Sequence, residues 1–226
     1  MENLLIALIG SLIVLDTTVV FQFSFSQPLI TCSILGWFFG DLQLGILVGF
    51  YLQLLWLSSI PIGGAIVPEG NVAAIVTCAL VLRYHMDHTY FNIIMVAAVL
   101  YGLIISFIGG QLVVVYRKIN VRLLNGVLAQ LDKDRINVLN LVPFISIFIH
   151  YLLMSLLILL SLSVGDKVFP YLARLPAGWD DYFRYPVIGI LGVGAGMVLT
   201  LYEEKEKNVY MIIGIILGAV IFYLGL

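Results

Sequence analysis

Several strongly polar side chains lie within or next to apolar stretches of this chain: Asp16, Gln22, Asp41, Gln53, Glu69 and Asn71. Such groups are costly to bury in a lipid bilayer, so they usually face a polar cavity or another protein surface. Gln53 lies in an apolar run without turn residues, and its amide can donate to and accept from a hydroxyl-rich ligand such as a sugar. A hydrogen bond between two helices is the alternative role of Gln53 that stays open.

The backbone is expected to leave the helical conformation in the following segment, Ser58–Asn71. Pro61 and Pro68 have no backbone N–H to donate, and glycine permits dihedral angles that other residues avoid. Irregular backbone persists at membrane depth only where protein covers it or where it lines a cavity, and transporters build substrate sites from such breaks. A loop exposed to water is the alternative, although the segment is very apolar for that. We therefore predict a substrate-binding site that includes Asp16, Gln53, Gly63, Gly64, Ala65, Glu69 and Asn71.

Three histidines are further candidates for chemistry. His85 and His88 flank Asp87 at a spacing that suits one helical turn, but a hydrated loop is the more common place for such a cluster. We expect no metal site there. His150 lies deep in the apolar run 144–160, where it can serve either as a packing hydrogen bonder or as a ligand group.

The composition indicates which solvent the chain folds in. Hydrophobic residues make up 62% of the chain and charged residues 11%, compared with roughly 45–50% and roughly 25% in soluble domains. The chain is therefore expected to be a polytopic membrane protein. Its net charge of −2 gives no sign of a nucleic-acid partner.

Other features of the sequence argue against catalysis and against a cleaved leader. Cys32 and Cys78 lack metal-ligand spacing, and Glu203 and Glu204 are expected at a solvated helix end, so we predict no catalytic residue. The first residues have neither the basic region nor the cleavage site of a secretory signal, so Leu4–Leu15 is predicted to be the first membrane segment.

The apolar runs predict an all-α fold with about seven to nine membrane segments. Several runs are shorter than the roughly 20 residues that a crossing helix needs, which is typical of broken or re-entrant helices. Similar glycine patterns in 34–49 and 188–197 are compatible with an inverted repeat and equally with glycine that serves close helix packing. We treat the chain as one integral membrane domain, 1–226, with a first half 1–115, a connection 116–137 and a second half 138–226.

The connection carries the densest group of basic residues in the chain: Arg117, Lys118, Arg122, Lys133 and Arg135. The positive-inside bias therefore predicts that it faces the cytoplasm. Leu123, Val127 and Leu131 recur within it at four-residue spacing, which predicts one face of an amphipathic helix.

Four motifs in the first half are distinctive: Gln27-Pro-Leu-Ile, Leu35-Gly-Trp-Phe-Phe-Gly-Asp-Leu-Gln-Leu-Gly-Ile-Leu-Val-Gly49, Leu52-Gln-Leu and Ile62-Gly-Gly-Ala-Ile-Val-Pro-Glu. The chain resembles, on these motifs, the membrane IIC component of the mannose/fructose/sorbose family of the bacterial sugar phosphotransferase system. The resemblance is strongest over 16–77 and adds Gln27 to the substrate-binding site. Members of that family usually carry Arg in place of Gln27, Glu in place of Gln53 and Asp or Asn in place of Glu69, and often a second Pro in place of Val67.

The resemblance implies a permease subunit of the bacterial inner membrane that binds a hexose-like sugar and delivers it to a cytoplasmic IIB subunit for phosphorylation. It also implies a IID membrane partner, cytoplasmic IIA and IIB proteins, and trimers of IIC–IID pairs. The phosphoryl-carrying residues are expected on the other subunits, which leaves open whether this chain counts as an enzyme, and no cofactor is expected. Two alternatives remain: a divergent structural or regulatory relative or non-phosphorylating facilitator, and an intramembrane enzyme.

Overall fold

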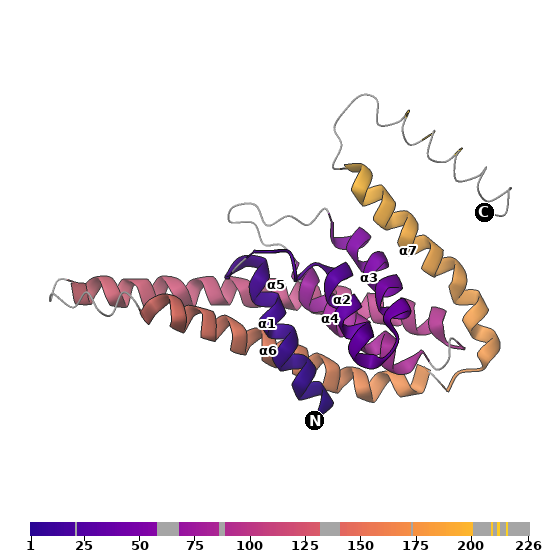
Figure 1. Ribbon diagram of the computed structural model, residues 1–226, viewed down its shortest axis with the longest axis horizontal. Helices are drawn as coiled ribbons and strands as arrows, with labels where there is room; N and C mark the ends of the chain where they lie inside the picture. Colours follow the sequence, from indigo (N-terminus) through magenta and orange to yellow (C-terminus); the bar gives the residue numbers. More distant parts are fainter. Residues whose placement is uncertain are drawn as a thin grey trace.

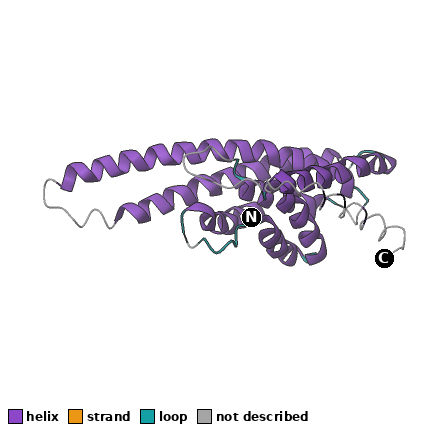
Figure 2. Ribbon diagram, turned by 90° about the horizontal axis from the view of Figure 1, so that it is seen from above, coloured by secondary structure: helices purple, strands orange, loops and turns teal. Residues whose placement is uncertain are grey.

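The computed structural model describes residues 1–20, 22–57, 68–85, 89–131, 141–172 and 174–200, together with Val209, Ile212 and Ile216. This part of the chain is all-helical, as the sequence predicts (Figures 1 and 2). Its helices are α1 (Glu2–Thr18), α2 (Pro28–Phe39), α3 (Leu42–Trp56), α4 (Gly70–Tyr84), α5 (Phe91–Leu131), α6 (Val142–Leu172), the 3-10 turn η2 (Ala177–Trp179) and α7 (Asp180–Thr200).

The described helices fall into long and short classes. Phe91–Ala129 of α5, Val142–Leu172 and Asp180–Leu199 of α7 are long and apolar enough to cross a membrane. By contrast, α2, α3 and α4 have 12, 15 and 15 residues. Helices of that length span about 18–22 Å, less than the roughly 30 Å of a hydrocarbon core. A short helix that starts at one membrane surface therefore ends inside the membrane, where its terminal peptide groups need protein partners.

Helix α4 forms the centre of the described fold. Every residue from Val72 to Leu82 is buried, because α1, α2, α3, α5 and α6 all pack against it. Small side chains such as Ala73, Ala74 and Ala79 let these neighbours approach the helix closely. The short helix α4 is thus shielded from lipid by other parts of the same chain.

Helices α5 and α6 pack side by side, and one end of the pair extends well away from the other helices (Figures 1 and 2). The amphipathic stretch that the sequence predicts after Tyr116 is the last part of α5, which continues without interruption to Leu131. Val127 on the predicted apolar face is buried. Lys133 and Arg135 lie outside the described residues.

Helices α2 and α3 form a tight hairpin. Gly40 ends α2 with a φ of +83°, a conformation that glycine adopts without strain. The Asp41 carboxylate accepts a hydrogen bond of 2.9 Å from the backbone N–H of Leu44 and so caps α3. A Cβ atom on Gly36 would lie 2.8 Å from the Cα of Gly45, so the two backbones are in direct contact there. The hairpin sets the position of Gln53 relative to the start of α2.

Candidate functional site

Polar side chains gather where α1 and α3 end and where α2 and α4 begin. Gln53 lies near the end of α3 and Gln27 immediately precedes α2. The side-chain Nε2 of Gln53 donates to Oε1 of Gln27 at 2.9 Å, and its own Oε1 accepts from the backbone N–H of Leu29 at 3.2 Å. Gln53 therefore caps an otherwise unpaired N–H in the first turn of α2, which is the helix-to-helix role that the sequence left open.

Asp16 organises the turn between α1 and α2. Its two carboxylate oxygens accept hydrogen bonds from the backbone N–H groups of Phe23 at 2.6 Å and Ser26 at 3.2 Å. The residue is buried, with 7% of its surface exposed. Because Ser26 immediately precedes Gln27, the Asp16 contacts hold Gln27 in position. Asp16 is thus a support for the predicted site, with both oxygens engaged by the chain itself.

Asn71 joins the start of α4 to the end of α1. Its Nδ2 donates to Oγ1 of Thr17 at 2.7 Å. Since Thr17 directly follows Asp16, this bond ties the first turn of α4 to the segment that positions Gln27. The structure therefore brings Asp16, Gln27, Gln53 and Asn71 together at adjoining helix ends.

Glu69 precedes α4 and packs against α5. Its backbone N–H donates to the carbonyl oxygen of Ser106 at 2.8 Å, and only 8% of the residue is exposed. A Cβ atom on Gly109 would lie 2.7 Å from the Cβ of Glu69, so a glycine is needed for this approach. The first part of the Glu69 side chain is therefore packed against α5.

Trp56, the last residue of α3, packs against the start of α4. A Cβ atom on Gly70 would lie 2.5 Å from the indole ring of Trp56, and 9% of Trp56 is exposed. The residues predicted between these two helices, Gly63, Gly64 and Ala65, lie in 58–67, outside the described residues. Their role in the site remains a prediction, and Asp87 and His88 likewise lie outside the described residues.

A second polar cluster lies at the opposite end of α4, where sequence reasoning predicted nothing. Asp166 in α6 pairs with Arg83 and accepts hydrogen bonds from Tyr84 Oη at 2.9 Å and Asn3 Nδ2 at 2.6 Å. Glu2 lies 3.5 Å from the Arg83 guanidinium. Asp166 lies within α6, which continues to Leu172. The sequence signal for this cluster is that residues of opposite charge occur at the ends of apolar runs.

The two histidines inside the described part have different surroundings. His85 Nε2 lies 3.7 Å from a carboxylate oxygen of Asp41, which links the end of α4 to the α2–α3 hairpin. The ring of His150 packs edge-on against Tyr116, with 4.7 Å between centroids. Neither nitrogen of His150 has a hydrogen-bond partner among the described residues, and 1% of the residue is exposed. In the structure His150 is therefore a packing residue.

Comparison with known proteins identifies similar sequences along most of the chain. The family model described as the sorbose-specific IIC component of the PTS system matches residues 1–224. The mannose-specific EIIC component of Escherichia coli K12 is 23% identical over 200 residues, which cover 88% of this chain and 73% of that protein. The sorbose-specific EIIC component of Klebsiella pneumoniae is 24% identical over 199 residues, covering 87% and 72%.

Two solved structures share the fold at 20% sequence identity. One, described as the structure of a membrane protein, has a TM-score of 0.75 and covers 97% of this chain and 87% of its own. The other is the cryo-EM structure of the mannose transporter ManYZ in complex with microcin E492, with a TM-score of 0.57 and coverage of 96% and 86%. Both support the helical membrane architecture.

Proposed function

Because the chain belongs to the family of sorbose-specific IIC components of the sugar phosphotransferase system, we propose that it binds a hexose-like sugar and delivers it to a cytoplasmic IIB subunit for phosphorylation. The chain is a sugar-translocating permease subunit of this system, like the mannose- and sorbose-specific relatives. The observation that carries the proposal is the family match along residues 1–224.

We place the sugar where the ends of α1 and α3 meet the starts of α2 and α4. Gln27 is exposed and Gln53 is half-buried, and each amide has donors and an acceptor that suit sugar hydroxyl groups. The Glu69 carboxylate adds an acceptor from the α4 side. The proposed site consists of Gln27, Gln53, Gly63, Gly64, Ala65, Glu69 and Asn71, with Asp16 as the residue that positions Gln27.

Sugar binding at this place requires the Gln27–Gln53 hydrogen bond to rearrange. The Nε2 group of Gln53 is engaged by Gln27 at 2.9 Å, and a sugar hydroxyl can replace that acceptor at little net cost, because one hydrogen bond is exchanged for another. The neutral amide of Gln53 accepts more weakly than the Glu that the family usually carries at this position. We therefore expect the wild-type chain to hold the sugar more weakly than a Gln53→Glu variant.

We also propose the assembly in which the subunit works: a IID-like membrane partner, cytoplasmic IIA and IIB proteins, and a trimer of IIC–IID pairs in the bacterial inner membrane, which the chain crosses several times. The family match and the similarity to the ManYZ transporter structure support an assembly of several subunits. Many large apolar side chains remain exposed on the described helices, as expected for surfaces that meet lipid or a partner subunit.

The test measures sugar uptake and sugar phosphate formation in cells that also produce the companion subunits. We expect Gln53→Leu to reduce uptake at least tenfold, because leucine can neither bind the sugar nor cap α2. Gln43→Leu, the same change at an exposed position of α3, serves as the matched control and stays close to the wild-type rate. Gln53→Glu keeps an acceptor for the Leu29 N–H and retains uptake.

Asn71 provides an independent arm of the same test. Asn71→Ala and Thr17→Val both remove the 2.7 Å hydrogen bond between α4 and α1, but only the first removes the amide. Loss of uptake in Asn71→Ala with uptake retained in Thr17→Val supports a sugar contact. Normal uptake by both Gln53→Leu and Asn71→Ala at wild-type protein levels would show that the site is misplaced. Uptake without any sugar phosphate would instead identify a facilitator.

A further inference from the structure

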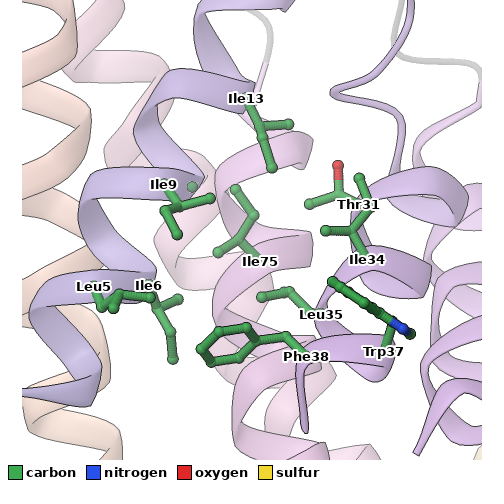
Figure 3. A pocket seen from close by; sticks show the side chains of 11 residues that line it. Leu5, Ile6, Ile9, Ile13, Thr31, Ile34, Leu35, Trp37, Phe38 and Ile75 are labelled. Carbon is green, nitrogen blue, oxygen red and sulfur yellow. The ribbon is translucent and has the colours of Figure 1, made fainter. Parts of the chain in front are cut away.

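An apolar groove runs between α1 and α2. Figure 3 shows its two walls, with Ile6 and Ile9 from α1 facing Ile34 and Leu35 from α2, and Ile75 of α4 at its base. The cavity has a volume of about 180 Å³. None of its lining residues belongs to the proposed sugar site, so the groove needs its own explanation.

The walls of the groove exclude water as the occupant. All but one of the lining residues are apolar or glycine, and the hydroxyl group of the exception, Thr31, donates to the carbonyl oxygen of Phe25 at 3.0 Å. A buried water needs two to four polar partners, whereas apolar cavities of about 150 Å³ stay dry and bind hydrocarbons such as benzene. The chemistry of the groove therefore suits a hydrocarbon.

The dimensions of the groove suit a thin, extended chain. From Leu5 to Ile13 the α1 wall has a length of about 12 Å, and the cavity between the two walls has a volume of about 180 Å³. An unfilled cavity also forfeits dispersion contacts along its lining, so an occupant that fits stabilises the fold.

The rims of the groove are apolar and exposed. Ile9 and Ile34 are 44% and 41% exposed, and Trp37 and Phe38 on the same rim of α2 are 74% and 52% exposed. In a membrane protein such side chains contact lipid tails, so a tail lying against the rim has direct access to the groove. We propose that an acyl chain of a membrane phospholipid inserts between α1 and α2 and reaches the level of Ile6, Leu35 and Ile75.

Photolabelling can test this with the full-length chain in vesicles of phosphatidylethanolamine and phosphatidylglycerol. The probe is a phospholipid with a diazirine in the middle of one acyl chain, and mass spectrometry of the irradiated protein locates the adducts. We expect adducts on Ile6 and Leu35, which are only 2% and 7% exposed, in addition to fully lipid-facing positions such as Leu12, which is 57% exposed. Labelling confined to exposed residues such as Leu12 would overturn the proposal.

Variants that fill the groove separate a bound tail from bulk lipid. Two variants each add a ring to the groove, Ile9→Trp from the α1 wall and Ile34→Trp from the α2 wall. Each is expected to reduce the adducts on Ile6 and Leu35 at least fivefold while the labelling of Leu12 is unchanged. Leu103→Trp is the matched control, because Leu103 is 46% exposed on α5 and lies outside the groove. Unchanged labelling of Ile6 and Leu35 in both groove variants would also contradict a tail held between α1 and α2.

Discussion

His150 shows at the scale of one residue how a polar side chain inside a membrane helix can serve packing. Its ring lies against Tyr116, whose hydroxyl group shares a 2.7 Å hydrogen bond with Ser146, and Ser146 in turn donates to Asn120 at 3.0 Å. Among the described residues, this series of hydrogen bonds between α5 and α6 involves neither nitrogen of His150. A buried polar group without a hydrogen bond destabilises a fold by about 1–3 kcal/mol.

We therefore expect His150→Phe to raise the thermal unfolding temperature of the purified chain in detergent, since phenylalanine keeps the ring contact with Tyr116 and removes the unpaired nitrogens. Ser146→Ala is the comparison, and its loss of two hydrogen bonds is expected to lower the unfolding temperature. A clear decrease for His150→Phe would indicate that a nitrogen of His150 has a partner after all.

Much of the candidate site at this scale could be predicted from residue types alone. A glutamine inside an apolar run and an asparagine after a proline-rich break both indicate buried polar contacts, and the structure places Gln53 and Asn71 at adjoining helix ends. The supporting role of Asp16 could not be predicted, because its partners, the N–H groups of Phe23 and Ser26, come within reach only once the turn between α1 and α2 has folded.

At the scale of helices, the cluster around Asp166 joins the start of α1, the end of α4 and α6. We expect Asp166→Ala to destabilise the chain by about 1–3 kcal/mol, less than a fully buried ion pair would, because 29% of the Asp166 side chain is exposed. In this variant the remaining carboxylate near the Arg83 guanidinium, among the described contacts, is that of Glu2, which lies farther away than Asp166.

A double-mutant cycle isolates the pair. The variant Arg83→Met with Asp166→Leu replaces both charges by apolar groups and is expected to recover most of the stability that Asp166→Leu alone loses. Unfolding in detergent measured for Arg83→Met, for Asp166→Leu and for the double variant gives the coupling. Additive losses in the double variant would mean that the two side chains do not stabilise the fold as a pair.

Glycine positions give a second prediction at the scale of helices. Gly45→Ala is expected to disrupt the α2–α3 hairpin, because the new Cβ atom would lie 2.5 Å from the carbonyl oxygen of Cys32. Gly126→Ala in α5 meets no atom within 4 Å and is expected to stabilise that helix by about 0.5–1 kcal/mol. Protein yield and unfolding temperature report both effects, and equal behaviour of the two variants would refute the close contact.

The boundaries of helices were harder to predict than their type. The run of apolar residues ends near Tyr116, yet α5 continues for about four more turns to Leu131, since helical propensity and packing against α6 extend a helix beyond its apolar core. Likewise the Arg83–Asp166 pair joins residues far apart in sequence, and a single sequence contains no signal for which opposite charges will meet.

At the scale of the whole molecule, the extended end of the α5–α6 pair carries the charges from which the orientation of the chain in the membrane is predicted. Arg117, Lys118 and Arg122 lie on this part of α5, and the positive-inside bias predicts that it faces the cytoplasm. A cysteine at the exposed position Asn125, in a chain in which Cys32 and Cys78 are replaced, tests the orientation. We expect an impermeant thiol reagent to label it only after the cells are permeabilised, and labelling in intact cells would contradict this topology.

The burial of α4 from Val72 to Leu82 has a consequence for how the chain is made. Translation proceeds from the N-terminus, so α4 leaves the ribosome before α5 and α6, which supply two of the surfaces that cover it. During that interval the newly inserted polypeptide contains a helix whose final neighbours do not yet exist. The final packing of α4 is therefore completed only in a later step, when the α5–α6 pair has been made.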